Sequence, residues 1–225
     1  MWTQGNIMNV VYFGYRSWAY IVLANLVRHG NPRWSIKETF RDGDAVHLIN
    51  KVDKPEVLLF YGWSWIIPKE VYDKYICLIC HISPLPKYRG GSPLQHQIMN
   101  GEKTSAVTIL RAREKLDTGE IYSQTPVSLN GTMDEIFERI AEIASKDTIK
   151  VLDQIATGKA KPKKQNDKKA TYYKRRKPEE SEIKLEDFDT AEQLYNFIRA
   201  LTFPYPNAYI VCKDGKKLYL TEAHL

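Results

Sequence analysis

Residues 57–81 read VLLFYGWSWIIPKEVYDKYICLICH and contain two short apolar runs, VLLFYG (57–62) and YICLICH (75–81). The PKEVYDKY stretch between them predicts a short helix, and this strand–helix–strand order favours parallel pairing of the two strands. In parallel α/β sheets, loops at the carboxyl ends of the strands form the ligand site. Gly62 and His81 both fall at such ends. The stretch therefore predicts an α/β fold and directs attention to these two positions.

The sequence before this stretch repeats the pattern. NVVYF (9–13) predicts a strand, Gly14 ends it, and SWAYIVLANLVRHG predicts a helix that begins near Ser17 and stops at Gly30. The segment from 31 to 56 is too weakly patterned for an assignment.

The sequence after residue 81 predicts two further strands and a long helix. The strands are expected over AVTILRA (106–112) and EIYSQTPVSL (120–129). Thr132 and Glu135 form a capping-box pattern ahead of an apolar face that continues to Gly158. The predicted fold class is therefore α/β, with a Rossmann-like, mostly parallel sheet and helices on both faces.

The composition is that of a soluble globular protein, with 43% hydrophobic and 27% charged residues. The first residues lack the basic and apolar regions of a signal peptide, and no later run reaches about 18 apolar residues. We therefore expect a cytoplasmic protein that does not interact with a membrane. Its three cysteines are expected to be reduced thiols.

A change of composition marks the end of the expected catalytic domain. Residues 159–177 hold ten Lys or Arg and one Asp, a net charge of +9, so the remainder carries 6 − 9 = −3. We predict a domain over 1–158, a basic connector over 159–177 and a small extension over 178–225. Within the extension, Thr190 and Gln193 predict a capped helix, and FPYPNAYIVCKDGKKLYLTEAHL predicts a β-hairpin with its turn at Asp214-Gly215.

The letters CLICH (77–81) match the Cys-x-x-Cys-His pattern of covalent haem attachment. In a strand, however, residues three apart point to opposite faces, so Cys77 and Cys80 are not expected to hold one ligand together. Neither haem nor a redox dithiol is expected. His81 then remains either a buried core histidine or a catalytic base.

The block HISPLPKYRGGSPLQHQI (81–98) combines a strand end with a restricted loop and a helix start. Pro84 and Pro86 limit the loop conformations, while Gly90 and Gly91 allow backbone to approach a ligand closely. Ser92 and Pro93 are typical of the start of a helix, whose free N–H groups favour an anion. An ordinary βα loop has the same pattern, so the residues alone leave both interpretations open.

These residues resemble a known protein family. HISPLPKYRGGSP, followed by VTILRAREKLDTGEI, resembles the formyltransferase family that uses 10-formyltetrahydrofolate. FGYRSWA, FYGWSWIIP, YRGGSPLQHQI, YYKRRKPEESEI and IRALTFPYPNAYI resemble its sugar-nucleotide N-formyltransferase branch. The resemblance implies formyl transfer to the amine of a nucleotide-linked amino-dideoxyhexose, such as dTDP-4-amino-4,6-dideoxyglucose, in surface-glycan or O-antigen synthesis.

The resemblance also assigns the catalytic pair. Such a reaction needs a neutral amine and a donor for the negative charge that develops on the formyl oxygen. His81 is then the general base or that donor, and Asp117 is its partner, because a carboxylate orients an imidazole and favours its protonated form. A turn aspartate ahead of Gly119 is the alternative for Asp117.

Other contacts follow from the same resemblance. Cofactor contacts are expected at Gly62, Trp63, Trp65, Ile67, Arg113 and Lys115, although both tryptophans also suit a hydrophobic core. Substrate contacts are expected at Gly14, Arg16, Ser83, Lys87, Arg89, Gly90, Gln95, Tyr173, Arg175, Arg176 and Tyr205. A homodimer is implied, and no metal, haem or nucleic acid is expected.

One position departs from the family pattern. The family commonly has Asn two residues before the catalytic His, and this chain has Ile79 there. Losing an oxyanion donor can lower a rate about a hundredfold or more. Gln95 and His96 are the nearest polar candidates in the sequence to replace the amide. The protein is otherwise expected to be slow, or to bind folate or nucleotide without turnover.

The basic stretch has three interpretations: a nucleic-acid surface, a solvated linker, or a linker followed by a substrate-binding segment. We favour the third, with KAKPKKQNDKK solvated and Arg175 or Arg176 on the diphosphate, because arginine suits bidentate phosphate contact. A methionyl-tRNA formyltransferase-like enzyme is the rival, but the 48 residues after the basic run (178–225) leave little room for a C-terminal barrel.

Overall fold

A computed structural model describes the backbone of residues 7–225 and their side chains, except those of residues 38, 44–46 and 50. Six strands form one sheet in the order β2-β1-β3-β4-β6-β7. They are β1 (Met8–Gly14), β2 (Trp34–Phe40), β3 (Val57–Tyr61), β4 (Ile76–Ile82), β6 (Thr104–Arg111) and β7 (Ile121–Ser128). Strands β2, β1, β3 and β4 run parallel, while β6 and β7 each pair antiparallel with the preceding strand. The predicted α/β class is confirmed.

The strand register brings the expected site positions to one edge of the sheet. Gly14 of β1 lies opposite Tyr61 of β3, and Tyr61 lies opposite Cys80 of β4. Gly62 and His81 follow directly after these paired residues. The carboxyl ends of three neighbouring parallel strands therefore meet where the sequence predicted a site.

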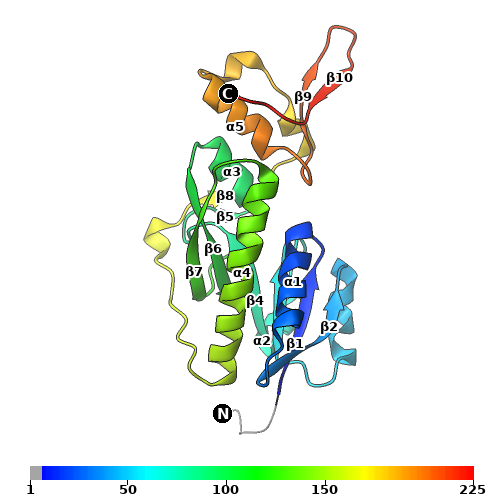
Figure 1. Ribbon diagram of the computed structural model, residues 1–225, viewed down its shortest axis with the longest axis vertical. Helices are drawn as coiled ribbons and strands as arrows, with labels where there is room; N and C mark the ends of the chain where they lie inside the picture. Colours follow the sequence, from blue (N-terminus) through cyan, green and yellow to red (C-terminus); the bar gives the residue numbers. More distant parts are fainter. Residues whose placement is uncertain (1–6) are drawn as a thin grey trace.

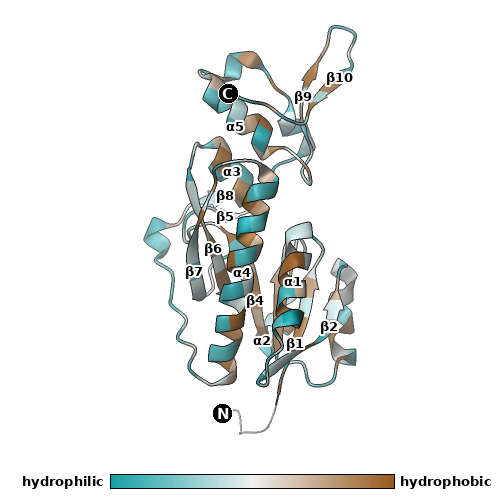
Figure 2. Ribbon diagram, in the orientation of Figure 1, coloured by the Kyte–Doolittle hydropathy of each residue, from teal (hydrophilic) through white to brown (hydrophobic). Residues whose placement is uncertain are grey.

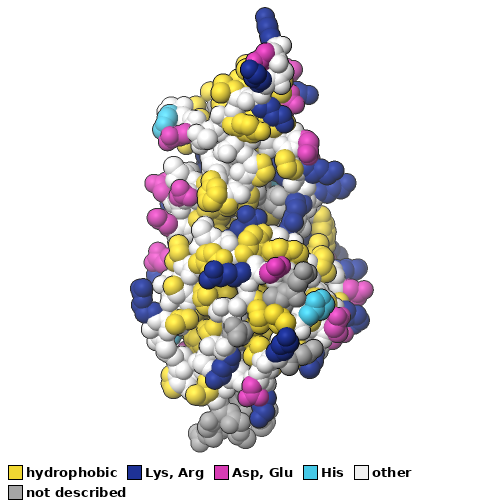
Figure 3. Space-filling view, turned by 90° about the vertical axis from the view of Figure 1, so that its right-hand side faces the viewer, with side chains coloured by type: hydrophobic (Ala, Val, Ile, Leu, Met, Phe, Trp, Pro, Cys, Tyr) yellow, Lys and Arg dark blue, Asp and Glu magenta, His cyan; other side chains and the backbone are white. Residues whose placement is uncertain are grey.

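The segment that the sequence left unassigned contains strand β2 and a 3₁₀ helix, η1 (Gly43–Lys51). Strand β2 forms the edge of the sheet next to β1 (Figure 1). Figure 3 faces the molecule from this side and shows apolar side chains interspersed with Lys and Arg. The segment thus adds the edge strand of the sheet and a 3₁₀ helix.

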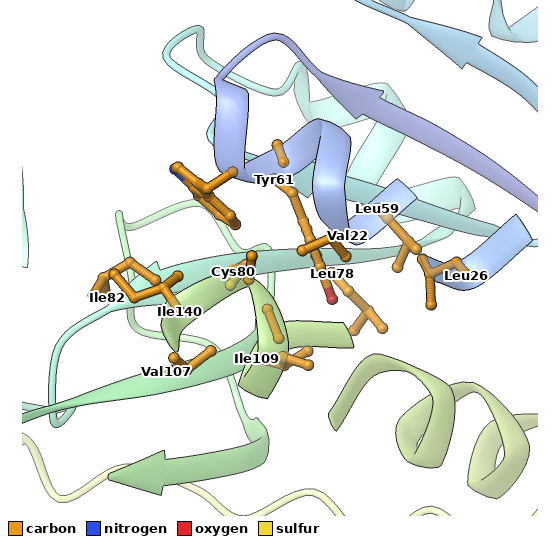
Figure 4. Close-up of a cluster of buried hydrophobic side chains, with 14 of the residues drawn as sticks. Val22, Leu26, Leu59, Tyr61, Leu78, Cys80, Ile82, Val107, Ile109 and Ile140 are labelled. Carbon is orange, nitrogen blue, oxygen red and sulfur yellow. The ribbon is translucent and has the colours of Figure 1, made fainter. Parts of the chain in front are cut away.

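One face of the sheet is covered by two helices, α1 (Ser17–His29) and α4 (Met133–Ala156). Figure 4 shows the core between them, where Val22 and Leu26 of α1 and Ile140 of α4 lie close to strand side chains such as Leu78. Polar and apolar residues alternate along α4, as expected for a helix with one buried face (Figure 2). Most of the buried apolar area therefore lies on this face.

The other face carries a thinner cover, the short helix α2 (Lys69–Lys74) and η1. Phe13 stacks on Phe60 at 4.6 Å between ring centroids. Cys77 belongs to this cluster and Cys80 to the core under α4, so the two thiols face opposite sides as expected. Burial raises the pKa of Cys77 to about 12 and raises that of Cys80 further. Neither thiol ionises near neutral pH, which argues against a redox dithiol.

Both predicted capping boxes are present. The Thr132 side chain accepts from the backbone N–H of Glu135, whose carboxylate accepts from the backbone N–H of Thr132 at 2.8 Å. Thr190 and Gln193 make the same reciprocal pair at α5 (Ala191–Ala200). These caps fix where the two helices begin.

The C-terminal part forms a small module with its own apolar cluster of Ile183, Ile198, Leu201 and Ala208. It contains α5 and an antiparallel hairpin of β9 (Ala208–Val211) and β10 (Lys217–Leu220), and it forms the end of the molecule beyond the sheet (Figure 1). Arg199 of α5 anchors it by donating to the carbonyl of Leu129 at 2.8 Å. The predicted helix and hairpin are confirmed, while the domain boundaries stay a prediction.

Within residues 7–225, no helix combines the length and apolar composition needed to cross a bilayer. In the same part of the chain, no three His, Cys, Asp or Glu side chains are grouped to hold a metal ion.

Candidate active site

His81 lies near the carboxyl end of β4 and is 7% exposed. Its Nε2 atom is 2.9 Å from the backbone oxygen of Tyr88. Because a carbonyl oxygen only accepts hydrogen bonds, Nε2 carries a hydrogen in this contact. The second ring nitrogen, Nδ1, has a different neighbour.

Asp117 faces that second nitrogen. Its Oδ1 atom is 3.5 Å from Nδ1 of His81, and its Oδ2 atom accepts a hydrogen bond from the backbone N–H of Gly90 at 2.8 Å. The structure thus brings together the two residues that the sequence paired. The Tyr88 carbonyl and the Asp117 carboxylate therefore flank the two ring nitrogens and fix the orientation of the imidazole.

Ser83 and Lys87 belong to the loop after β4. Ser83 is fully buried, and its hydroxyl donates to the carbonyl of Lys87 at 2.9 Å. The Ser83 hydroxyl thus closes the loop, and the substrate contact at Ser83 stays a prediction. The Lys87 side chain is exposed, and its substrate contact stays a prediction.

Arg89 is held by hydrogen bonds within the protein. Its side chain is 0% exposed, and its guanidinium donates to Gln165, to the Tyr172 hydroxyl at 2.6 Å and to Asp167 at 2.7 Å. These partners all belong to the basic connector. Arg89 therefore holds the connector, and its substrate contact stays a prediction.

The two glycines after Arg89 have a related role. Strand β5 (Arg89–Gly90) pairs with β8 (Tyr172–Tyr173), and a Cβ on Gly90 would lie 2.3 Å from the Tyr173 carbonyl. A Cβ on Gly91 would lie 2.4 Å from Arg175. The glycines therefore permit close approach of the connector, and the substrate contact at Gly90 stays a prediction.

The loop after β3 carries the expected cofactor residues. Trp63 packs against Phe60, and its indole N–H is buried without a hydrogen-bond partner. Trp65 is 44% exposed and lies 4.7 Å from Trp63 between ring centroids. Ile67 packs against the thinner core, next to this loop. The loop thus offers an exposed ring and an unsatisfied donor.

Two other residues that were predicted to contact the cofactor, Arg113 and Lys115, have exposed side chains. Arg113 forms an exposed, bidentate ion pair with Glu120, with the nearest N–O distance 2.9 Å. The Lys115 side chain is exposed, and its carbonyl accepts from the Thr118 hydroxyl at 2.8 Å. The structure shows no free guanidinium at Arg113, and both contacts stay predictions.

Residues from three distant segments meet beside the loop after β3. Arg16 lies over the rings of Tyr15 and Tyr205, at 4.7 and 5.8 Å. The Tyr15 hydroxyl is 2.5 Å from the Ser64 hydroxyl, and Arg175 donates to the Ser64 carbonyl at 3.2 Å. The structure therefore brings the predicted residues Arg16, Arg175 and Tyr205 into one cluster, next to the end of β1 at Gly14.

The electrostatics of this cluster suit an anion. Among the side chains that the structure describes, neither Arg16 nor Arg175 forms an ion pair with a carboxylate. Burial raises the pKa of Tyr205 to about 12, although the nearby Arg16 acts in the opposite direction. The phenol therefore stays neutral and can donate a hydrogen bond at working pH.

The end of the connector lies against α3 (Pro93–Met99). Tyr173 stacks on Tyr88 at 4.8 Å, and His96 of α3 approaches the carbonyl of Lys174 at 3.0 Å. His96 is therefore engaged by the connector, and it does not replace the missing amide. Gln95 is buried, and its predicted contact stays open.

Arg176 and Ser92 form a second link. The expected helix start is correct, but the Ser92 hydroxyl makes no cap and instead accepts from the backbone N–H of Arg176 at 3.1 Å. The Arg176 guanidinium donates to the Glu180 carbonyl and lies 5.5 Å from the Phe197 ring. Arg176 therefore packs toward the C-terminal module, and Arg175 is the better candidate for a phosphate.

Ile79 packs against the thinner core and lies opposite Phe60 in the strand register. By the alternation of β4, it shares the face of His81. An apolar side chain therefore stands where the family pattern has an amide.

Gln165 is the site residue that sequence reasoning missed. It bonds to Arg89 and to the turn that carries Asp117. Its only signal in the sequence is a neutral side chain within a lysine-rich run. The connector is thus only partly the solvated linker that was expected, because its lysines are exposed while Gln165 is half-buried.

Comparisons with known proteins agree with this geometry. The family model described as "Formyl transferase" matches residues 25–152, which is more than half of the chain. The chain belongs to the formyl transferase family. Residues 178–222 match a second model, "N-formyltransferase dimerization C-terminal domain". That match coincides with the C-terminal module.

Three known proteins illustrate what this chain is similar to. The structure of a methionyl-tRNA formyltransferase from Clostridium thermocellum is 34% identical, with a TM-score of 0.79, over 96% of this chain and 98% of that chain. A 4-N formyltransferase from Francisella tularensis is 19% identical, with a TM-score of 0.80, over 98% and 100%, which shows the shared fold alone. The methionyl-tRNA formyltransferase of Bacillus subtilis is 35% identical over 81% of this chain.

The chain spans only 50–60% of the length of the first curated relatives that it matches.

Proposed function

We propose that this formyl transferase family member transfers a formyl group from 10-formyltetrahydrofolate to the amine of a nucleotide-linked amino-dideoxyhexose. The observation that carries the proposal is the position of Arg16 and Arg175, which have no carboxylate partner in the described chain, at the same sheet edge as His81 and Asp117. A nucleoside diphosphate carries the charge that two free guanidinium groups recognise. An acceptor bound there would place its sugar toward the acid–base pair.

The residues after β3 fit a folate. Trp63 offers a buried N–H without a partner, and Trp65 offers an exposed ring for a flat heterocycle. Trp63, Trp65, Ile67 and the backbone at Gly62 would hold the pterin. When bound, the cofactor supplies the formyl group as an acyl donor.

His81 would take the proton from the attacking amine or donate to the formyl oxygen. The Tyr88 carbonyl, 2.9 Å from Nε2, and the Asp117 carboxylate, 3.5 Å from Nδ1, fix the ring orientation for this role. Gly90 in turn fixes the carboxylate through its backbone N–H. Since Ile79 supplies no donor to the developing oxyanion, we expect a slower enzyme than a relative with Asn there.

We also propose a homodimer. The support is the match of residues 178–222 to a dimerization domain, together with exposed apolar side chains on the hairpin, including Leu218 and Tyr219.

Formyl transfer to a panel of dTDP-linked 3-amino and 4-amino sugars, followed by mass spectrometry, tests this function. We expect one acceptor to be formylated in the presence of 10-formyltetrahydrofolate, and Asp117→Asn to lower the rate about a hundredfold. Calorimetric binding of cofactor and sugar nucleotide without turnover would contradict the proposed activity and would indicate a binding protein.

A second candidate is formylation of methionyl-tRNA. It is favoured by the 34% identity to the Clostridium thermocellum protein over its full solved length. It is also favoured by the exposed lysines of the connector, since phosphate contacts dominate nucleic-acid affinity. Formylation of charged initiator tRNA with no sugar product would select it.

A further inference from the structure

One connector side chain joins the buried Arg89 to the turn that carries Asp117. The Oε1 atom of Gln165 accepts hydrogen bonds from Nε and Nη2 of Arg89, at 3.1 and 2.7 Å. Its Nε2 atom donates to the carbonyls of Asp117 and Gly119, each at 2.8 Å. Arginine only donates and a carbonyl only accepts, so this amide orientation alone satisfies all four contacts.

The turn that receives these bonds has an unusual backbone. Asp117 has a φ of 55°, in the left-handed region that non-glycine residues seldom adopt. Two residues later the chain is tightly packed, since a Cβ on Gly119 would lie 1.8 Å from the Arg111 carbonyl. Such a conformation persists where surrounding contacts hold it, and Gln165 supplies two of them.

Arg89 and Gly90 hold Asp117 from two sides. The Gly90 N–H donates to the carboxylate at 2.8 Å, whereas Arg89 acts on the backbone of Asp117 through Gln165. Arg89 is fully buried and Gln165 is half-buried, so water competes weakly for these bonds. The contacts converge on the one residue that faces Nδ1 of His81.

We propose that Gln165 is a positioning residue that holds the Asp117 turn so that the carboxylate faces His81. The effect on rate rests on the proposed formyl transfer, while the effect on the turn does not. Since a displacement of about 1 Å in an active site can cost a hundredfold in rate, loss of this support should be visible in turnover.

Gln165→Glu is the most informative variant. It preserves the size of the side chain and both contacts to Arg89, but it places an acceptor against two carbonyls. We expect kcat to fall between about tenfold and a hundredfold, with KM for both substrates changed less than about twofold. Lys164→Ala, at the exposed neighbouring position, is the matched control and should behave as the parent.

Hydrogen exchange tests the same claim without activity. We expect faster exchange in a peptide covering residues 113–119 of Gln165→Glu, with unchanged exchange in α4. If Gln165→Glu does not fold, Gln165→Ala is measured in the same way. Exchange in 113–119 equal to that of Lys164→Ala would overturn the proposal, even if no formyl acceptor is found.

A double-mutant cycle separates positioning from general damage. In an Asp117→Asn background, Gln165→Glu should lower kcat by less than about twofold further, because its partner in the mechanism is already lost. A loss equal to that seen in the parent background would show that Gln165 does not act through Asp117.

Discussion

Strand β4 presents two different surfaces. Leu78, Cys80 and Ile82 enter the core beneath α1 and α4, whereas Cys77 and Ile79 pack on the thinner side beneath α2 and η1. His81 follows Ile79 on that thinner side by strand alternation. One strand therefore supplies both the best-packed part of the fold and its candidate base.

The two faces of the sheet are covered by helices of very different length, which explains why the candidate base lies on only one of them. Helix α4 has 24 residues, whereas α2 has 6, and the thinner side leaves Trp65 exposed next to the strand ends. A face sealed by long helices has no room for a ligand, while a lightly covered face does. Alternate side chains of β4 point to opposite faces of the sheet. One set therefore contributes to stability and the other contains the candidate base.

Removing the base should have the largest effect. We expect His81→Ala to lower kcat for formyl transfer about a thousandfold, since general base catalysis contributes about 10²–10⁴. Steady-state kinetics would measure this loss, with unfolding curves to establish that the variant is folded. His224→Ala, at an exposed C-terminal position, is the control. Equal rates for both variants would remove His81 from the mechanism.

Truncation on the two faces should affect stability unequally. Leu78→Ala should lower the free energy of unfolding by about 3 kcal/mol, because the side chain is 0% exposed under two helices. Ile79→Ala, on the half-buried side, should cost about 1 kcal/mol. Urea denaturation of both variants measures the difference. Equal losses of unfolding free energy in the two variants would contradict the proposed difference in packing between the two faces of the sheet.

Replacing Ile79 by Asn should raise the catalytic rate. Ile79→Asn should raise kcat about tenfold, because it returns a donor near the reacting oxygen, and should reduce stability because Ile79 packs on apolar residues. Initial rates and urea unfolding of the same preparation test both halves of this expectation. An unchanged or lower kcat in a folded variant would mean that another group already fills the role.

Removing a phosphate contact should change binding more than turnover. Arg175→Ala should raise KM for the sugar nucleotide about tenfold and change kcat by less than about twofold. Arg28→Ala, at the exposed end of α1, serves as the matched charge control. A fall in kcat with unchanged KM would place Arg175 outside the acceptor site.

The smallest effect concerns the thiols. At pH 8, a disulfide reagent should label only Cys212 of the native protein, since Cys77 and Cys80 are buried. Burial raises the pKa of Cys77 to about 12, so the reactive thiolate is scarce until the pH approaches that value or the fold opens. Denatured protein should react at all three thiols. Rapid native labelling of Cys77 would contradict its place in the packed face.

The sequence was most informative where local pattern and burial coincide. The apolar run of β4, the capped helix α4 and the pairing of His81 with Asp117 could all be predicted, because periodicity, capping residues and motif order mark them. The 3₁₀ helix η1 could not, because its residues show no helical period long enough to recognise.

Hydrogen bonds between polar side chains far apart in the sequence could not be predicted either. Arg89 was expected at the substrate, yet it bonds to Gln165, 76 residues further along the chain. Which polar groups become partners depends on how the connector returns over the site, and no local pattern encodes that path. The same reason explains why Gly90 faces the connector.

The central claim is that the lightly covered face forms a nucleotide-sugar formylation site. It is tested most directly by a competition in which limiting, isotopically labelled 10-formyltetrahydrofolate is offered to dTDP-4-amino-4,6-dideoxyglucose, its 3-amino isomer and methionyl-tRNA together. We predict that the label enters a sugar nucleotide, and that His81→Ala abolishes this product. Label in the tRNA alone would contradict the account.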